Sequence, residues 1–150
     1  MTIYRLHEEP LQESWLDAYG HLNEAYYLVP FSNATWKLQD EFAIGTEYFD
    51  ATGCALYTVE THLRYLGEVR APATLQVESM VLGVDPKKVH IGHVLRVDGT
   101  ERASFECLML HYDTRAGATA PFPEAALEAL QAAVLDPTPD WVGRSVKQLK

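Results

Sequence analysis

The sequence contains few cysteines and no long apolar run. Cys54 and Cys107 are the only cysteines among 150 residues, and neither lies in a CxxC or Cys/His spacing. This pattern favours two reduced thiols over a disulfide framework or a zinc site. No apolar stretch approaches the ~20 residues that cross a membrane, and the N-terminus is charged where a signal peptide is apolar. We therefore expect a cytoplasmic protein that does not enter a membrane.

Motifs of several common enzyme classes are also missing from the sequence. There is no Gly-x-Ser-x-Gly elbow, so a serine-hydrolase triad is not predicted, and no GxGxxG or P-loop for nucleotides is present. The histidines do not form a metal pattern, because the odd spacing of His90 and His93 on a predicted strand sends their rings to opposite faces. We expect no metal and no cofactor.

Basic residues are scarce and unevenly distributed. Twelve lysines and arginines stand against 21 acidic residues, which gives a net charge of −9. This balance argues against nucleic acid as a ligand, because phosphate binding needs a concentrated basic face. Residues 1–60 hold 2 basic and 10 acidic residues, whereas residues 61–102 hold 6 and 5. We expect any anionic ligand to contact the middle of the chain.

Length and periodicity predict a single α+β domain over residues 1–150, with a C-terminal tail over residues 136–150. Apolar residues at spacings of three and four predict one long helix after Asn23, which is a good N-cap. Pro30 is expected to kink this helix and Gly45 to end it. The predicted buried stripe consists of Tyr27, Phe31, Ala34, Leu38 and Phe42.

Alternating apolar residues predict an antiparallel sheet wrapped on that helix. A first strand is expected at Ile3–Leu6, ending before Pro10. On the strand that begins near residue 55, Tyr57 and Leu63 are predicted to share one face. Such a sheet leaves edges that a second copy of the chain would cover. The later strands are expected near residues 55–65, 75–79, 89–95 and 103–112, and a short helix over 124–135.

The segment from Asp17 to Asn23 combines a carboxylate with the start of the predicted helix. A helix start presents unpaired N–H groups and the positive end of the helix dipole, which stabilise a developing oxyanion. A carboxylate beside it would act as a general base for water or attack an acyl carbon directly. The residues alone leave open the alternative that Asp17 only stabilises the loop.

The pattern Asp17-x-x-Gly20-His21-x-Asn23-x-x-Tyr26, followed by a long helix, resembles the hotdog-fold acyl-CoA thioesterases of the 4-hydroxybenzoyl-CoA thioesterase type. Three further segments are similar to the betainyl-CoA thioesterases, a group associated with carnitine breakdown. These segments are Thr52-Gly53-Cys54, Glu60-Thr61-His62 and Ala120-Pro121-Phe122-Pro123.

The resemblance implies a hotdog fold and a homodimer, or a dimer of dimers, with acyl-CoA at the subunit interface. It implies that Asp17 is the catalytic carboxylate and that the carbonyl-polarising amide lies near Asn23 or Glu24. Some relatives carry a second asparagine at position 24, so the glutamate here leaves that role to the backbone N–H. Gly20 and His21 would position the substrate or the carboxylate, with turn capping as the alternative for His21.

Two further groups of residues are candidates for substrate contacts. Arg64, Arg70, Lys87 and Lys88 would meet the phosphates of coenzyme A, and the alternative is that the lysines are ordinary solvated charges. Aromatic faces near the motif would hold a cationic trimethylammonium acyl group, which the acidic first 60 residues also favour. These aromatic residues are Trp15, Tyr19, Tyr26, Tyr27 and Trp36.

The sequence therefore predicts an acyl-CoA thioesterase that releases free acid and CoA, acting on betainyl-CoA or on another short-chain or aryl acyl-CoA. One alternative is a hydroxyacyl-thioester dehydratase on the same fold, for which His21 near Asp17 is the candidate His/carboxylate pair. The other alternative is a non-catalytic, oligomeric acyl-CoA-binding domain.

Overall fold

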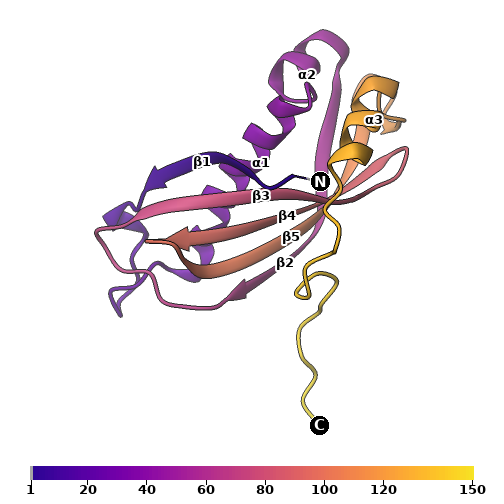
Figure 1. Cartoon of the computed structure of the whole chain (residues 1–150). Coiled ribbons are helices and arrows are strands. Elements are labelled where there is room, and N and C mark those ends of the chain that lie inside the picture. The colour runs from indigo at the N-terminus through magenta and orange to yellow at the C-terminus, as the bar shows by residue number, and fades with distance from the viewer. Residues whose placement is uncertain (1) are drawn as a thin grey trace.

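The computed structural model describes residues 2–150 and shows an antiparallel sheet curled around one long helix, α1 (Figure 1). The strand order is β1-β3-β4-β5-β2, with the short β6 paired to β5. This confirms the predicted α+β fold. In chain order the elements are β1 (Tyr4–Pro10), 3-10 turns at Glu13–Trp15 and Glu24–Tyr27, α1 (Leu28–Glu41), α2 (Thr46–Thr52), β2 (Cys54–Tyr65), β3 (Thr74–Val84), β4 (Lys88–Val97), β5 (Thr100–Asp113), β6 (Ala118–Thr119) and α3 (Glu124–Ala133).

Helix α1 packs on the inner face of the sheet through the predicted stripe, all five members of which are buried. Phe31 stacks on Phe105 of β5 with ring centroids 4.9 Å apart, and burial of such a side chain stabilises the fold by roughly 1.5–3 kcal/mol. The expected kink is not formed. Pro30 lies in the first turn of α1, where its missing N–H costs no helical hydrogen bond, and α1 runs unbroken to Glu41.

Several predicted boundaries differ from the structure, and one helix was not predicted. Strand β1 continues through Pro10, which pairs with Thr74, because an edge strand tolerates a proline. Helix α2 between Gly45 and Gly53 was not predicted, since seven residues are too few to show a helical period. Helix α3 ends at Ala133, two residues earlier than expected.

An irregularity in β2 reverses the predicted faces of its first half. The register with β5 shifts between Thr58 and Glu60, which leaves Val59 as an extra residue. Before the shift Thr58 pairs with Met109 of the core, and Tyr57 lies on the outer face, stacked on Tyr112. The predicted grouping of Tyr57 with the inward residues after the shift is therefore wrong.

The C-terminal segment covers part of the outer face of the sheet. In Figure 1 the long helix α1 lies behind the sheet, and the chain after α3 descends in front of it. Leu135, Trp141 and Val142 pack against a separate apolar cluster on this face. Within residues 2–150, no helix combines the length and the hydropathy that a membrane crossing requires.

Candidate active site

Residues 15–23, which precede α1, form a small hairpin that holds the Asp17 carboxylate. The Asp17 N–H donates to the His21 carbonyl at 2.8 Å, and Leu16 and Leu22 form an isolated antiparallel bridge. Oδ1 of Asp17 accepts the N–H of Tyr19 at 2.8 Å and that of His21 at 3.2 Å. Gly20 has φ +81°, a left-handed conformation that favours glycine. Asp17 is therefore oriented by its own loop.

The two oxygens of Asp17 are in different situations. Oδ1 is committed to the loop, whereas Oδ2 has no hydrogen-bond partner within residues 2–150. The side chain is only partly buried, so water and ligands reach it. An oriented carboxylate with one open oxygen is suited to take a proton from water or to attack an electrophile. The loop-stabilising role and a chemical role are thus compatible.

The predicted helix cap is formed at Asn23. Its Oδ1 accepts the N–H of Ala25 at 3.0 Å, and its carbonyl accepts the N–H of Tyr26 at 3.0 Å. The first turn is a 3-10 helix over Glu24–Tyr27, not the start of α1 itself. Within residues 2–150 the N–H of Glu24 remains a free donor, while its side chain is exposed. Among the described residues, the Glu24 backbone N–H is therefore an unpaired donor at this helix start.

The hairpin is docked on the segment that connects β2 to β3. The Leu22 N–H donates to the Val69 carbonyl at 2.8 Å. The Tyr27 hydroxyl donates to the Gly67 carbonyl at 3.4 Å. Nε2 of His21 lies 3.1 Å from Oε2 of Glu68. The imidazole of His21 therefore faces Glu68, and only its backbone N–H reaches Asp17.

The four predicted coenzyme A contacts are not brought together in one chain. Arg70 lies over the hairpin, with its guanidinium 3.5 Å from the position that a Cβ on Gly20 would take. Arg64 donates to the Ser104 hydroxyl at 3.1 Å on the outer face. Lys87 and Lys88 lie at the opposite end of β3, whose 11 residues span roughly 35 Å.

Arg102 and Glu68 border the hairpin and were not predicted. The guanidinium of Arg102 approaches within 3.1 Å of a Cβ position on Gly67, and its Nε is buried without a hydrogen-bond partner. Glu68 lies between His21 and Arg70, with a 3.5 Å ion pair to Arg70. Both residues come from segments distant in sequence from the motif, so no spacing signal pointed to them.

The pKa of Tyr27 is shifted by burial and by the charges around the hairpin. Burial raises the pKa of its hydroxyl above the ordinary value, and the nearby Tyr65 and the negative charges of Asp17 and Glu68 raise it further. The positive charge of Arg102 acts in the opposite direction. Tyr27 therefore stays a neutral hydrogen-bond donor that helps hold the hairpin.

A pair of stacked aromatic rings flanks the hairpin. Trp15 precedes Asp17 and Tyr26 follows Asn23, and their rings lie parallel with centroids 6.0 Å apart. Tyr26 is 40% exposed, so the pair is in contact with solvent. Of the other predicted aromatic residues, Tyr27 is buried, Tyr19 is exposed at the tip of the hairpin, and Trp36 is exposed on α1.

His93 is a buried histidine with two hydrogen-bond partners, and the two cysteines are free thiols. His93 lies between the hydroxyls of Thr35 and Ser79, each 2.8 Å from a ring nitrogen. Complete burial lowers the pKa of His93 to about 3, so the ring is neutral. Cys54 and Cys107 are free thiols, and burial raises the pKa of Cys107 to about 12. No group of three or more His, Cys, Asp or Glu residues within 2–150 is placed to hold a metal ion.

A groove opens between α1 and β2, on the edge of the sheet. It has a volume of about 350 Å³, and Trp36, Leu56 and Met109 are among its lining residues. β2 is an outermost strand, and Tyr57, Val59 and Tyr65 on it are about half exposed. This edge combines unpaired backbone groups with an apolar surface.

Comparison with known proteins agrees with the resemblance carried by the motif. The sequence profile of the Thioesterase-like superfamily matches residues 11–130. The chain is 39% identical to the L-carnitine dehydrogenase/betainyl-CoA thioesterase of Agrobacterium fabrum, over 97% of this chain and 31% of that protein. It is 36% identical to the betainyl-CoA thioesterase of Pseudomonas aeruginosa, over 96% of this chain and 94% of that protein. A Pseudomonas putida protein, described as a candidate thioesterase, superposes with a TM-score of 0.82 at 31% identity, over 100% of this chain and 99% of that one.

Proposed function

The chain belongs to the Thioesterase-like superfamily, and we propose that it hydrolyses the thioester of betainyl-CoA to betaine and free CoA. The observation that supports this reaction is the geometry of the Asp17 carboxylate. Its Oδ1 accepts two backbone N–H groups, whereas its Oδ2, without a partner within residues 2–150, is free to react. The choice of acyl group is supported by the Pseudomonas aeruginosa relative, which is a betainyl-CoA thioesterase and is matched over 94% of its length. The prediction of a thioester hydrolase agrees with both comparisons.

The proposed mechanism uses the Asp17 carboxylate and the backbone N–H of Glu24. The thioester carbonyl oxygen accepts a hydrogen bond from the Glu24 N–H, at the positive end of the helix that follows. Asp17 either takes a proton from the water that attacks the carbonyl carbon, or attacks that carbon itself to form a mixed anhydride that water then hydrolyses. In both routes the C–S bond breaks and CoA leaves as a thiolate, which is then protonated. A thiolate is a good leaving group, so no strong general acid is required.

We propose that the stacked pair of Trp15 and Tyr26 binds the trimethylammonium group of the substrate. A quaternary ammonium ion is attracted to the negative face of an aromatic ring. The excess of acidic residues in the first 60 positions adds a favourable field for a cation. The same field disfavours an anionic acyl group.

We propose further that two chains pair through β2 in a cytoplasmic homodimer. The exposed apolar residues on β2, together with its unpaired edge, are a surface that a second copy would cover. Antiparallel pairing of the two β2 strands would place opposite ends of the sheets side by side. That arrangement would bring Lys87 and Lys88 of one chain toward the Arg64 and Arg70 end of the other, where CoA phosphates would bind.

A panel of four thioesters tests the proposed reaction. Betainyl-CoA is compared with tert-butylacetyl-CoA, which has the same shape but a neutral carbon in place of the ammonium nitrogen, and with acetyl-CoA and benzoyl-CoA. The expected result is thiol release that is fastest from betainyl-CoA. Equal rates from all four would remove betainyl-CoA as the substrate. Binding of the esters without thiol release would support a non-catalytic acyl-CoA-binding domain instead.

A further inference from the structure

The outer face of the sheet carries an apolar patch that the chain covers with its own tail. Met80 and Leu82 of β3 and Val94 of β4 project from the face opposite α1, and each is less than 10% exposed. The residues that bury them belong to the segment after α3. This segment starts with an isolated parallel bridge between Val134 and Val81, and the Leu135 N–H donates to the Val81 carbonyl at 2.9 Å.

Trp141 is seated in a notch that a glycine leaves in the sheet. A Cβ on Gly92 of β4 would lie 2.8 Å from the Trp141 ring, 2.9 Å from Leu82 and 3.2 Å from Met80. Any other residue at position 92 would therefore displace the indole or the two side chains beside it. The absence of a side chain at Gly92 is what allows the tail to lie close to the sheet.

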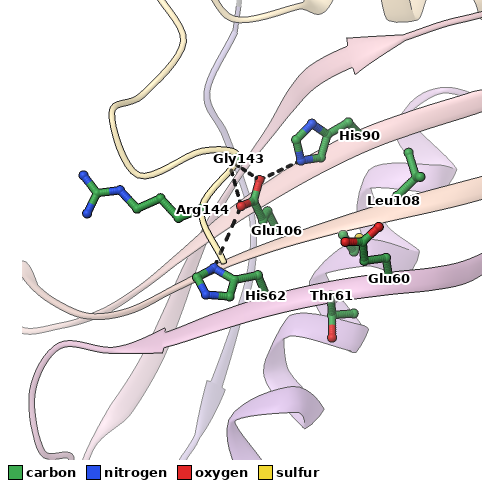
Figure 2. A pocket seen from close by; sticks show the side chains of 9 residues that line it. Glu60, Thr61, His62, His90, Glu106, Leu108, Gly143 and Arg144 are labelled. Atoms are coloured by element: carbon green, nitrogen blue, oxygen red, sulfur yellow. Dashed lines mark hydrogen bonds and ion pairs between the residues drawn. The ribbon is translucent and has the colours of Figure 1, made fainter. Parts of the chain in front are cut away.

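Glu106 of β5 fastens the end of this segment. Its side chain is 7% exposed, and its two carboxylate oxygens accept the Gly143 N–H at 2.9 and 3.0 Å. Nε2 of His90 lies 2.7 Å from the same carboxylate, and Nδ1 of His62 lies 3.9 Å from it, as Figure 2 shows. A buried carboxylate without such partners is costly, so the tail and the carboxylate stabilise each other. Gly143 has φ +79°, a conformation that favours glycine at the fastening point.

We propose that residues 134–143 form an intramolecular strap that occupies the outer face of the sheet and prevents a second copy of the chain from docking there. The strap has no regular secondary structure after Val134, and residues 143–150 are exposed. Its attachment rests on a few contacts, chiefly those of Trp141 and Gly143. A segment attached in this way opens locally at a lower free-energy cost than global unfolding.

The surface under the strap fits a second copy of the same chain. Without the tail, Met80, Leu82 and Val94 would form one exposed apolar patch, and such patches promote association. Two sheets pack face to face about 10 Å apart, and a two-fold axis pairs each patch with itself. On the same face Arg5 and Arg96 both pair with Glu78, so charges of both signs border the patch.

Two substitutions release the strap in different ways, and a third is their matched control. Trp141→Ala removes the anchor from the tail, and Gly92→Ala fills the notch without altering the tail. The control is Gly83→Ala on the neighbouring strand, where the nearest atom to a new Cβ is 3.9 Å away. The full-length variants are compared with the wild type by hydrogen–deuterium exchange of the peptide that contains residues 141–143 and by light scattering over a range of concentrations.

We expect exchange in this peptide to be at least about tenfold faster in Trp141→Ala and Gly92→Ala, with a molar mass that rises with concentration beyond that of the wild type. Gly83→Ala is expected to match the wild type in both measurements. Unchanged exchange in Trp141→Ala would overturn the strap. Faster exchange with an unchanged mass would overturn its role in preventing association. Circular dichroism of the same variants shows whether the fold is intact.

Discussion

Asp17 and Glu106 are both carboxylates that accept backbone N–H groups, yet their surroundings differ in one decisive way. Asp17 accepts two N–H groups on Oδ1, and its Oδ2 has no partner within residues 2–150. Glu106 is almost fully buried, and both of its oxygens accept the Gly143 N–H while His90 approaches one of them. One carboxylate has an open oxygen beside solvent, whereas the other has none.

This difference is the reason that we assign the proposed chemistry to Asp17 and a structural role to Glu106. A general base or nucleophile needs a lone pair that is oriented but not already engaged. A histidine next to a carboxylate, as at His90 and Glu106, resembles a catalytic pair. Here, however, both carboxylate oxygens already accept the Gly143 N–H. Those hydrogen bonds show that Glu106 attaches the C-terminal segment to the sheet, whereas Asp17 keeps one oxygen free for the reaction proposed above.

The largest expected effect is the loss of turnover on removing the charge of Asp17. Asp17→Asn keeps the Oδ1 that accepts the Tyr19 and His21 N–H groups, so we expect the hairpin to stay folded. The amide that replaces Oδ2 neither attacks nor takes a proton, so kcat should fall at least ~100-fold. Thiol release from betainyl-CoA measures the rate, and circular dichroism checks the fold.

Asp113→Asn is the matched control for this substitution. Oδ1 of Asp113 also accepts two backbone N–H groups, those of Arg115 and Ala116, at 2.9 and 3.1 Å. Asp113 pairs with Cys54 at the start of β2, whereas the hairpin docks on the segment that follows the end of β2. We expect kcat to be unchanged. An Asp17→Asn variant that retains more than about a tenth of the rate would exclude Asp17 as the reacting group.

A second prediction concerns His93, which resembles Glu106 in having every polar atom engaged. Its pKa is lowered from 6.5 to about 3 by burial, so below pH 6.5 the unfolded chain binds a proton that the folded chain does not. The stabilisation from the neutral ring is complete above pH 6.5 and is lost as the pH falls towards 3, by up to about 1.4 kcal/mol per pH unit. Urea unfolding of the wild type and of His93→Gln between about pH 7.5 and 5 measures this. A pH dependence that is identical in both proteins would contradict it.

Much of the fold was predictable from local patterns. The helical stripe from Tyr27 to Phe42 and the Asn23 cap are local features, because they depend on residues within one or two turns. The register shift at Val59 is not local. It is a property of the pairing between β2 and β5, and an alternating sequence gives no sign of which residue is the extra one. The faces predicted from alternation therefore failed in the first half of β2.

The candidate site was predictable only where it is continuous in sequence. Asp17, Gly20 and Asn23 lie in one motif, and the structure places them in one hairpin. Arg102 and Glu68 lie beside the hairpin only because the fold brings distant segments together, and residue spacing in the sequence does not predict such a contact. Lys87 and Lys88 have the right charge for CoA phosphates, but the length of β3 places them far from the hairpin of their own chain.

A third and smaller effect is expected at Asn23. Its carboxamide oxygen is engaged like the oxygens of Glu106, but it lies at the edge of the hairpin that holds Asp17. Asn23→Ala removes the hydrogen bond to the Ala25 N–H and should lower the free energy of unfolding by about 1 kcal/mol. Because the helix start then frays, kcat should fall as well. Asn23→Asp retains a cap and should recover the stability. Urea unfolding and thiol release are measured on both, and an Asn23→Ala variant of wild-type stability would show that the cap does not hold the hairpin.

The smallest expected effect is on substrate preference, and it tests whether the hairpin is selective as well as reactive. Trp15→Leu keeps an apolar side chain but removes the aromatic face that stacks on Tyr26. A cation over an exposed ring gains about 0.5–1 kcal/mol, so the preference for betainyl-CoA over tert-butylacetyl-CoA should fall by a few fold in kcat/KM. Phe49→Leu removes a half-exposed ring on α2 that no proposed contact uses, so it is the control and should leave the ratio unchanged. If Trp15→Leu lowers both rates equally, the stacked pair shapes the hairpin and does not recognise the charge. If only the betainyl-CoA rate falls, the open carboxylate and the aromatic face belong to one site, in which Asp17 reacts and the rings next to it select the acyl group.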